Sequence, residues 1–280
     1  MKIAWITDTA PLLSQQFIEQ HNINVLPLQV VFGEEAYRET VDITSKEFYE
    51  KLNTYSGHPT SAQPNFGEHV AMYERLKAEG YDCAIAIHVS AKQSGTFSSA
   101  AMAAEQAGFK TYAVDSKIGS LPIQKMVEAG MAAANAGKSI DEIIATIEDV
   151  RDKSELMFIP ANLEKLHKSG RVSGTAMFIS NLLNIKLVIK YEDGVCIVDK
   201  KVRAEKRAKQ AIIDNLNSAI AKSEVREVAV IHTNDEAAAN AWKQELEQLY
   251  PYITFSTLEL CLVVGALTGE GTVGLTWVRA

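Results

Sequence analysis

Short apolar runs alternate with stretches of helical periodicity over the first 160 residues of this 280-residue chain. The runs at residues 2–7, 25–32, 83–88 and 111–114 have the length and composition of buried strands. Buried strands that alternate with helices are typical of a largely parallel sheet with helices on both faces. We therefore predict an α/β domain of this kind for residues 1–159.

The second half of the chain has a different pattern. Residues 185–190 and 195–202 are β-like, and the Glu-Asp-Gly sequence at 192–194 between them predicts a hairpin turn. A helical stretch at 204–221 follows, and further strands and a helix come after it. Hairpins mixed with helices indicate a smaller α/β domain with a mixed sheet, which we place at residues 160–280.

Local signals mark several element boundaries. Thr44 with Glu47 and Ser139 with Glu142 have the spacing of capping boxes, so each pair predicts the start of a helix. Residues 55–64 are rich in Gly, Pro and hydroxyl side chains, and they predict a loop.

Composition limits the classes of partner. Apolar residues make up 47 % of the chain, and 28 Lys and Arg against 35 Asp and Glu give a formal charge of −7. This acidic balance argues against nucleic-acid binding, which normally needs a basic surface. No apolar run approaches the ~18 residues of a membrane span, and Asp8 interrupts the N-terminal run before a signal-peptide core forms. We expect a cytoplasmic protein without stable membrane insertion.

Common motifs for metals, nucleotides and serine hydrolases do not have the required spacing. The three cysteines are far apart, and no His or carboxylate group has metal-ligand spacing, so we expect no metal and no cofactor. The glycines at 269, 271 and 274 spell G-x-G-x-x-G, but a β-like run follows them instead of a helix. Lys92 stands where a nucleophile elbow around Ser94 needs glycine.

Polar loops follow the predicted strands at their carboxyl ends. Asp8 follows the first strand, the loop at 90–94 follows the third, and Asp115 follows the fourth. Ligands of open parallel sheets bind at this edge. The segment 94–96 also opens a helix, whose free N–H groups favour an anion, although Ser and Thr are equally the usual helix caps. The residues alone leave both interpretations open.

Seven blocks of the sequence, taken in order, match the motifs of one known family. The blocks are Thr7–Thr9, Ser61–Pro64, Ser90–Ala100, Val114–Ser116, Leu163–Ser173, Lys201 with Arg203, and Leu267–Gly274. In this order they resemble the DegV family of bacterial fatty-acid-binding proteins.

The resemblance implies a two-domain α/β fold with one long-chain fatty acid in a tunnel between the domains. It assigns the carboxylate of the fatty acid to the hydroxyls of Ser61 and Ser94 and to the neighbouring Gly95 backbone. Thr60 replaces Ser61 if the loop register differs by one residue. The remaining residues expected at the ligand are Thr268, Arg171 and Arg203. The two arginines either meet the ligand or a partner, or support the fold through hydrogen bonds and ion pairs.

The resemblance also suggests a protein partner. Some family members present the bound carboxylate to a separate fatty acid kinase subunit, which phosphorylates it. This chain departs from the family at the head group, with Leu267 in place of a histidine, Glu270 in place of a proline and Ser61 in place of a threonine. The oligomeric state is not indicated.

A hydrocarbon ligand is physically reasonable for such a site. Each buried methylene contributes about 0.8 kcal/mol, so the tail supplies most of the affinity, while hydroxyls and an N–H need only satisfy the carboxylate. Candidates for the tunnel lining are residues 177–179, Leu182 with Leu183, and the run 260–267.

Two alternatives remain open from the sequence. One is a hydrolase or phosphoryl-transfer enzyme that uses Ser94 with Asp115 or His232 in the same cleft. The other is a non-catalytic carrier whose ligand is not a fatty acid.

Overall fold

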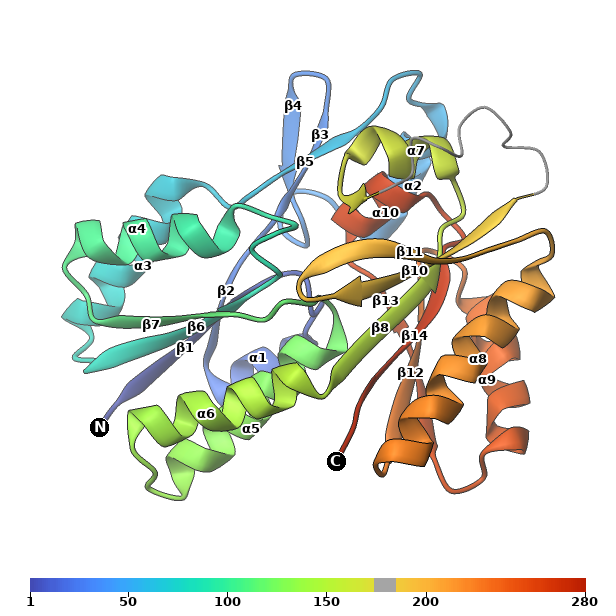
Figure 1. Ribbon diagram of the computed structural model, residues 1–280. Helices are drawn as coiled ribbons and strands as arrows, with labels where there is room; N and C mark the ends of the chain where they lie inside the picture. The colour runs from blue at the N-terminus through green and yellow to red at the C-terminus, as the bar shows by residue number, and fades with distance from the viewer. Residues whose placement is uncertain (174–184) are drawn as a thin grey trace.

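The computed structural model describes residues 1–173 and 185–280, which form three sheets covered by helices (Figure 1). The helices are α1 (Gln15–His21), α2 (Ser45–Thr54), α3 (Phe66–Ala78), α4 (Thr96–Ala107), α5 (Leu121–Asn135), α6 (Ile140–Asp152), α7 (Leu163–Ser169), α8 (Glu205–Lys222), α9 (Glu236–Leu249) and α10 (Leu262–Thr268). Within the described ranges, none of these helices has the length and apolarity needed to cross a membrane.

The strands alternate with these helices in chain order. They are β1 (Ile3–Asp8), β2 (Ile23–Leu26), β3 (Gln29–Phe32), β4 (Glu35–Arg38), β5 (Thr60–Ala62), β6 (Cys83–His88), β7 (Thr111–Asp115), β8 (Ser154–Ile159), β9 (Val172–Ser173), β10 (Lys186–Glu192), β11 (Val195–Val202), β12 (Glu227–His232), β13 (Thr254–Glu259) and β14 (Val273–Val278).

A parallel sheet forms the centre of the N-terminal half. Its order is β2-β1-β6-β7, and every pairing is parallel. Helices α3 and α4 cover one face and α1, α5 and α6 cover the other (Figure 1). Successive residues of β1 reach both layers, because Ile6 packs in the cluster with α3 and α4 while Trp5 packs in the cluster with α5 and α6. The predicted covered parallel sheet is confirmed.

The run at 25–32, predicted as one strand, forms two strands in different sheets. β2 ends at Leu26 in the parallel sheet, and β3 begins at Gln29 in a three-stranded antiparallel sheet of order β4-β3-β5. Pro27 stands between them and has no N–H for a strand ladder. The prediction of a loop across residues 55–64 was wrong in part, since Thr60–Ala62 pairs with β3 as β5.

A mixed sheet of seven strands forms the C-terminal half, in the order β13-β12-β14-β8-β10-β11-β9. Strand β8 lies inside this sheet, antiparallel to both β14 and β10. Thus the last strand of the segment 1–159 pairs with strands of the segment 160–280. The α/β fold class with a mixed second sheet is confirmed, while the division at residue 159 stays a prediction.

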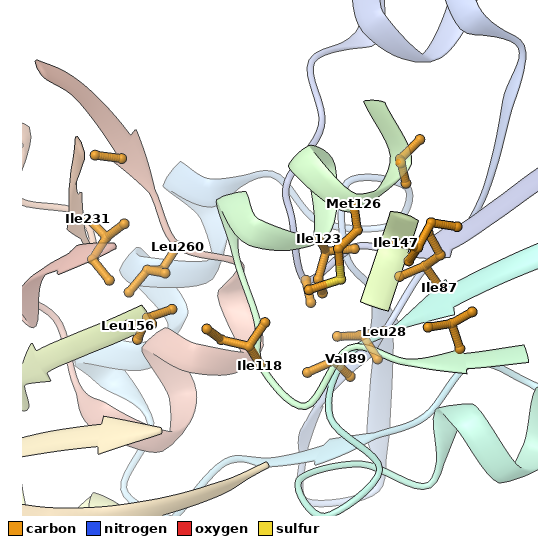
Figure 2. Close-up of a cluster of buried hydrophobic side chains, with 14 of the residues drawn as sticks. Leu28, Ile87, Val89, Ile118, Ile123, Met126, Ile147, Leu156, Ile231 and Leu260 are labelled. Carbon is orange, nitrogen blue, oxygen red and sulfur yellow. The ribbon is translucent and has the colours of Figure 1, made fainter. Parts of the chain in front are cut away.

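A cluster of buried apolar side chains connects the parallel sheet with the seven-stranded sheet. Leu28 and Val89 belong to it on the side of the parallel sheet, Leu156 and Leu260 on the side of the seven-stranded sheet, and Ile118 lies between them (Figure 2). The two halves of the chain therefore share part of their core.

Candidate functional site

A cavity of about 600 Å³ lies where the two large sheets, β5 and α10 meet. This volume is within the range of about 300–1,000 Å³ for small-molecule sites. Apolar side chains form much of its wall, and they include Leu28, Val89, Leu156, Phe158, Leu166, Val172, Leu260, Val263, Val264 and Leu267. Four of these come from the run 260–267, which the sequence predicts as a lining. The other predicted linings, 177–179 and Leu182 with Leu183, lie outside the described residues.

Five of the seven predicted site residues line this cavity, namely Ser61, Ser94, Gly95, Arg171 and Thr268. Thr60 instead lines a smaller adjoining pocket. Side chains alternate between the faces of a strand, so the neighbours Thr60 and Ser61 of β5 point in different directions. Arg203 is exposed and is not among the described residues that line either pocket.

Ser94 and Gly95 lie at the start of α4. The Ser94 hydroxyl is 2.8 Å from the Thr96 hydroxyl and accepts a hydrogen bond from the Thr96 N–H. Gly95 is the N-cap, with no side-chain cap. A Cβ at Gly95 would meet the end of the Gln63 side chain, so the segment after β5 lies against this helix start. The two hydroxyl-bearing segments named by the sequence thus adjoin.

Arg171 adds a positive charge beside Ser61. One guanidinium nitrogen, Nη2, lies 3.4 Å from the Ser61 Oγ, and Nη1 donates to the Ser169 carbonyl at 2.6 Å. The side chain is half-buried at the cavity wall. One nitrogen thus holds the backbone and another faces Ser61, while a contact of Arg171 with the ligand or a partner stays a prediction.

The Thr268 hydroxyl is engaged within the protein. It donates to the Val264 carbonyl at 2.8 Å and accepts from the Thr272 hydroxyl at 2.9 Å. Its proton is therefore already used, and the exposed fraction of the residue is only 4 %. A direct contact of Thr268 with a ligand stays a prediction.

Leu267 and Glu270, the two residues that differ from the family at the C-terminal motif, lie in different places. Leu267 lines both the cavity and the adjoining pocket, so its apolar side chain lies beside Arg171 at the wall. Glu270 accepts hydrogen bonds from the Asn53 side chain at 3.0 Å and the Asn234 side chain at 2.6 Å. Because Glu270 is not among the described lining residues, it does not place an acid at the cavity wall.

A buried carboxyl that sequence reasoning missed lies behind this wall. Glu39 is fully buried, and one oxygen accepts from the Val263 N–H at 2.5 Å while the other accepts from the Thr9 hydroxyl. Burial, the largest cause, raises the pKa of Glu39 to about 7 although the hydrogen bonds from Thr9 and Val263 lower it, and the nearby Asp8 contributes to the increase. Glu39 follows a polar, strand-like segment, so no local pattern separates it from a surface residue.

Asp115 and His232, which the enzyme alternative places with Ser94, form hydrogen bonds with backbone N–H groups. Asp115 accepts from the N–H groups of Ala91 and Lys117, and His232 Nδ1 accepts from the Asp235 N–H. Among the residues that the structure describes, the Ser94 hydroxyl bonds to Thr96, and the Ser94 N–H donates to the Ser90 carbonyl at 3.0 Å. Asp8, which sequence analysis places at the sheet edge, accepts from the N–H groups of Val89 and Ala10 and so organises the loops.

Comparison with known proteins gives one consistent result. The family model for uncharacterised proteins of the DegV family matches residues 2–280. A DegV domain-containing protein of Listeria monocytogenes is 34 % identical, and the match covers 99 % of this chain and 98 % of the relative.

Solved structures of the same family are similar over the whole chain. The crystal structure of DegV, a fatty acid binding protein from Bacillus subtilis, has a TM-score of 0.89, 35 % identity and 100 % coverage of both chains. A DegV family protein from Thermus thermophilus, described for its fatty acid binding, has a TM-score of 0.90, 28 % identity and 100 % coverage of both chains.

Proposed function

Because this chain belongs to the DegV family, we propose that it binds a long-chain fatty acid in the cavity and acts as a carrier. The observation that carries the proposal is the distribution of polarity in the cavity, where apolar walls adjoin a group formed by Ser61, Ser94 and Arg171. The fatty acid binding of the Bacillus subtilis and Thermus thermophilus relatives supports the same ligand class.

The head group is matched by donors of the right kind. A carboxylate accepts hydrogen bonds only, and the two serine hydroxyls and the guanidinium are donors. The bond from Arg171 is charge-assisted and therefore stronger than a neutral one. An ionised carboxylate without such partners would be costly to bury, so these residues make the acidic end acceptable while the tail supplies most of the affinity.

We further propose that the carboxylate is presented to a separate fatty acid kinase. Gln63 and Gly95, beside Ser94, are exposed, so this end of the cavity reaches the surface where a second protein can approach. The contacts of Ser94 with Thr96 also favour a presenting role over catalysis by this chain. Formation of acyl phosphate from the loaded protein, ATP and a purified kinase subunit, with none formed without the kinase, tests this role.

The decisive test of binding is identification of the ligand. Protein purified without added lipid is extracted with organic solvent, and the extract is analysed by mass spectrometry. We expect a long-chain fatty acid in an amount approaching one per protein chain. A different bound molecule would favour the carrier of another ligand, and an empty extract together with no binding of labelled palmitate would overturn the proposal.

A further inference from the structure

A second, polar pocket of about 310 Å³ adjoins the cavity. Its lining consists of Lys117, Ile118, Arg151, Asp152, Ser154, Tyr191, Asp193 and Gly194. Among the residues that the structure describes, Tyr191 alone lines both this outer pocket and the cavity. Its side chain is therefore the partition between an apolar space and a charged one.

The β10–β11 hairpin holds this partition in place. Tyr191 is paired with Cys196 in the antiparallel ladder, so the two side chains lie on the same face of the hairpin, and both line the cavity. Gly119 lies opposite, and a Cβ added there would be 3.7 Å from the Tyr191 hydroxyl and 3.9 Å from Val89. The hydroxyl end of Tyr191 thus faces a gap one methyl group wide.

Tyr191 lies two strands from β9, because its ladder partner Cys196 pairs in turn with Val172, the residue after Arg171. Helix α10 runs along the cavity with Thr268 at its last residue and Cys261 as its N-cap, and both residues line the cavity. Its seven residues span roughly 10 Å at about 1.5 Å per residue. Cys261 is close enough to Tyr191 to help raise the pKa of the tyrosine, after burial, the larger cause. Tyr191 and Cys261 are both part of the cavity wall.

We propose that Tyr191 sets the longest acyl chain that the cavity accepts. This inference rests on the proposed function, since it concerns the tail of the same ligand. A tail that passed Tyr191 would enter a pocket lined by Lys117, Arg151 and Asp152. Methylenes next to water and charges gain no hydrophobic stabilisation, so the ring ends the useful length of the cavity.

Replacement of Tyr191 tests the inference. We expect Tyr191→Ala to shift the co-purified fatty acids toward longer chains and to tighten the Kd of long saturated acids, by about fourfold for each methylene that fills the space left by the ring. The measurements are mass spectrometry of the extract and titration with saturated acids from myristic to arachidic. Tyr191→Phe keeps the ring and should keep the wild-type profile.

A second variant changes the same end of the cavity in the opposite direction. Gly119→Ala places a methyl group against Tyr191 and Val89 at ordinary contact distance, so it should fold and shift the profile toward shorter chains. If folded Tyr191→Ala and Gly119→Ala proteins both keep the wild-type profile, Tyr191 does not set the length. If Tyr191→Ala does not fold, an unchanged Gly119→Ala profile alone overturns the inference. A wild-type protein that binds no fatty acid would instead overturn the proposed function.

Discussion

At the scale of single residues, the direction in which a side chain points matters as much as the residue type. Thr60 and Ser61 are adjacent and both carry a hydroxyl, yet only Ser61 lines the cavity. Pairing of β5 with β3 fixes this choice, because Val30 lies opposite Ser61 in the ladder. The sequence resemblance left open which of the two lies at the ligand, and the strand formed inside the predicted loop places Ser61, not Thr60, at the cavity wall.

The first residue-scale prediction concerns the Ser94 hydroxyl. We expect Ser94→Ala to weaken binding of a fatty acid by about tenfold or more, because a hydrogen bond to a charged group contributes about 1.5–3 kcal/mol. Isothermal titration with palmitate measures the change in Kd. Ser98→Ala, at an exposed position of the same helix, is the matched control and should leave Kd unchanged. Equal Kd values for the two variants would remove Ser94 from the head-group site.

The second residue-scale prediction concerns Glu39 and pH. Its folded pKa of about 7 lies above the ordinary value of 4.5, so the folded protein holds this proton while the unfolded chain has lost it. The free energy of unfolding should therefore fall as pH rises from 4.5 to about 7, by up to about 3 kcal/mol from this group. Glu39→Gln should lack this contribution. Urea unfolding across the interval measures the difference between variant and wild type.

His69 adds a second pH dependence to the stability of both proteins in that experiment. Burial lowers the pKa of His69 from 6.5 to about 4, so stability falls as pH decreases through this interval, opposite in sign to Glu39. Both proteins keep His69, and its contribution cancels when the two are compared. Parallel stability curves for the variant and the wild type would show that Glu39 is ionised at all these pH values.

At the scale of elements, local signals located helices and turns well. The capping boxes of α2 and α6 form as predicted, since Thr44 and Ser139 each accept from the N–H three residues later. The turn at 192–194 also forms, with positive φ angles at Asp193 and Gly194. These features depend on neighbouring residues only. Strands β3 and β5 were missed as separate elements because their pairing depends on residues some thirty positions apart.

The β10–β11 hairpin carries the element-scale prediction. Asp193 at its turn is bound by Lys92 at 3.3 Å and Lys117 at 2.8 Å, and the Gly194 carbonyl accepts from the Ser90 hydroxyl at 2.7 Å. These contacts hold the hairpin against the loop before α4 (Figure 1). Asp193→Asn should accelerate release of a fluorescent fatty acid only severalfold, because exposed ion pairs are screened by solvent and contribute little. Stopped-flow dissociation measures the rate.

Salt and charge provide the controls for this prediction. The wild-type rate should approach the variant rate at high salt, where exposed ion pairs are screened. Glu74→Gln, at an exposed position of α3, changes the net charge equally and should leave the rate unchanged. Dissociation that is equally fast in wild type and Asp193→Asn at low salt would show that the turn contacts do not retain the ligand.

At the scale of the whole molecule, the sequence pattern predicted the two kinds of sheet but not how the chain is shared between them. Strand β8 follows the last helix of the first half, yet its partners β10 and β14 come 27 or more residues later, as Ile189 pairs with Phe158 and Val278 with Ser154. Periodicity carries no information on such distant pairing. The same holds for the cavity, whose polar residues were named through the family resemblance and whose partition at Tyr191 appears only in three dimensions.

The shared core between the two sheets has a consequence for how any occupant leaves. Leu156, Leu260 and Val89 belong both to the cluster that joins the sheets and to the cavity wall. A guest that touches these side chains packs against the same residues that join the two sheets, so we expect its release to depend on how readily this region opens. The lifetime of the complex and the resistance of this region to hydrogen exchange should then both depend on the free energy of the same local opening.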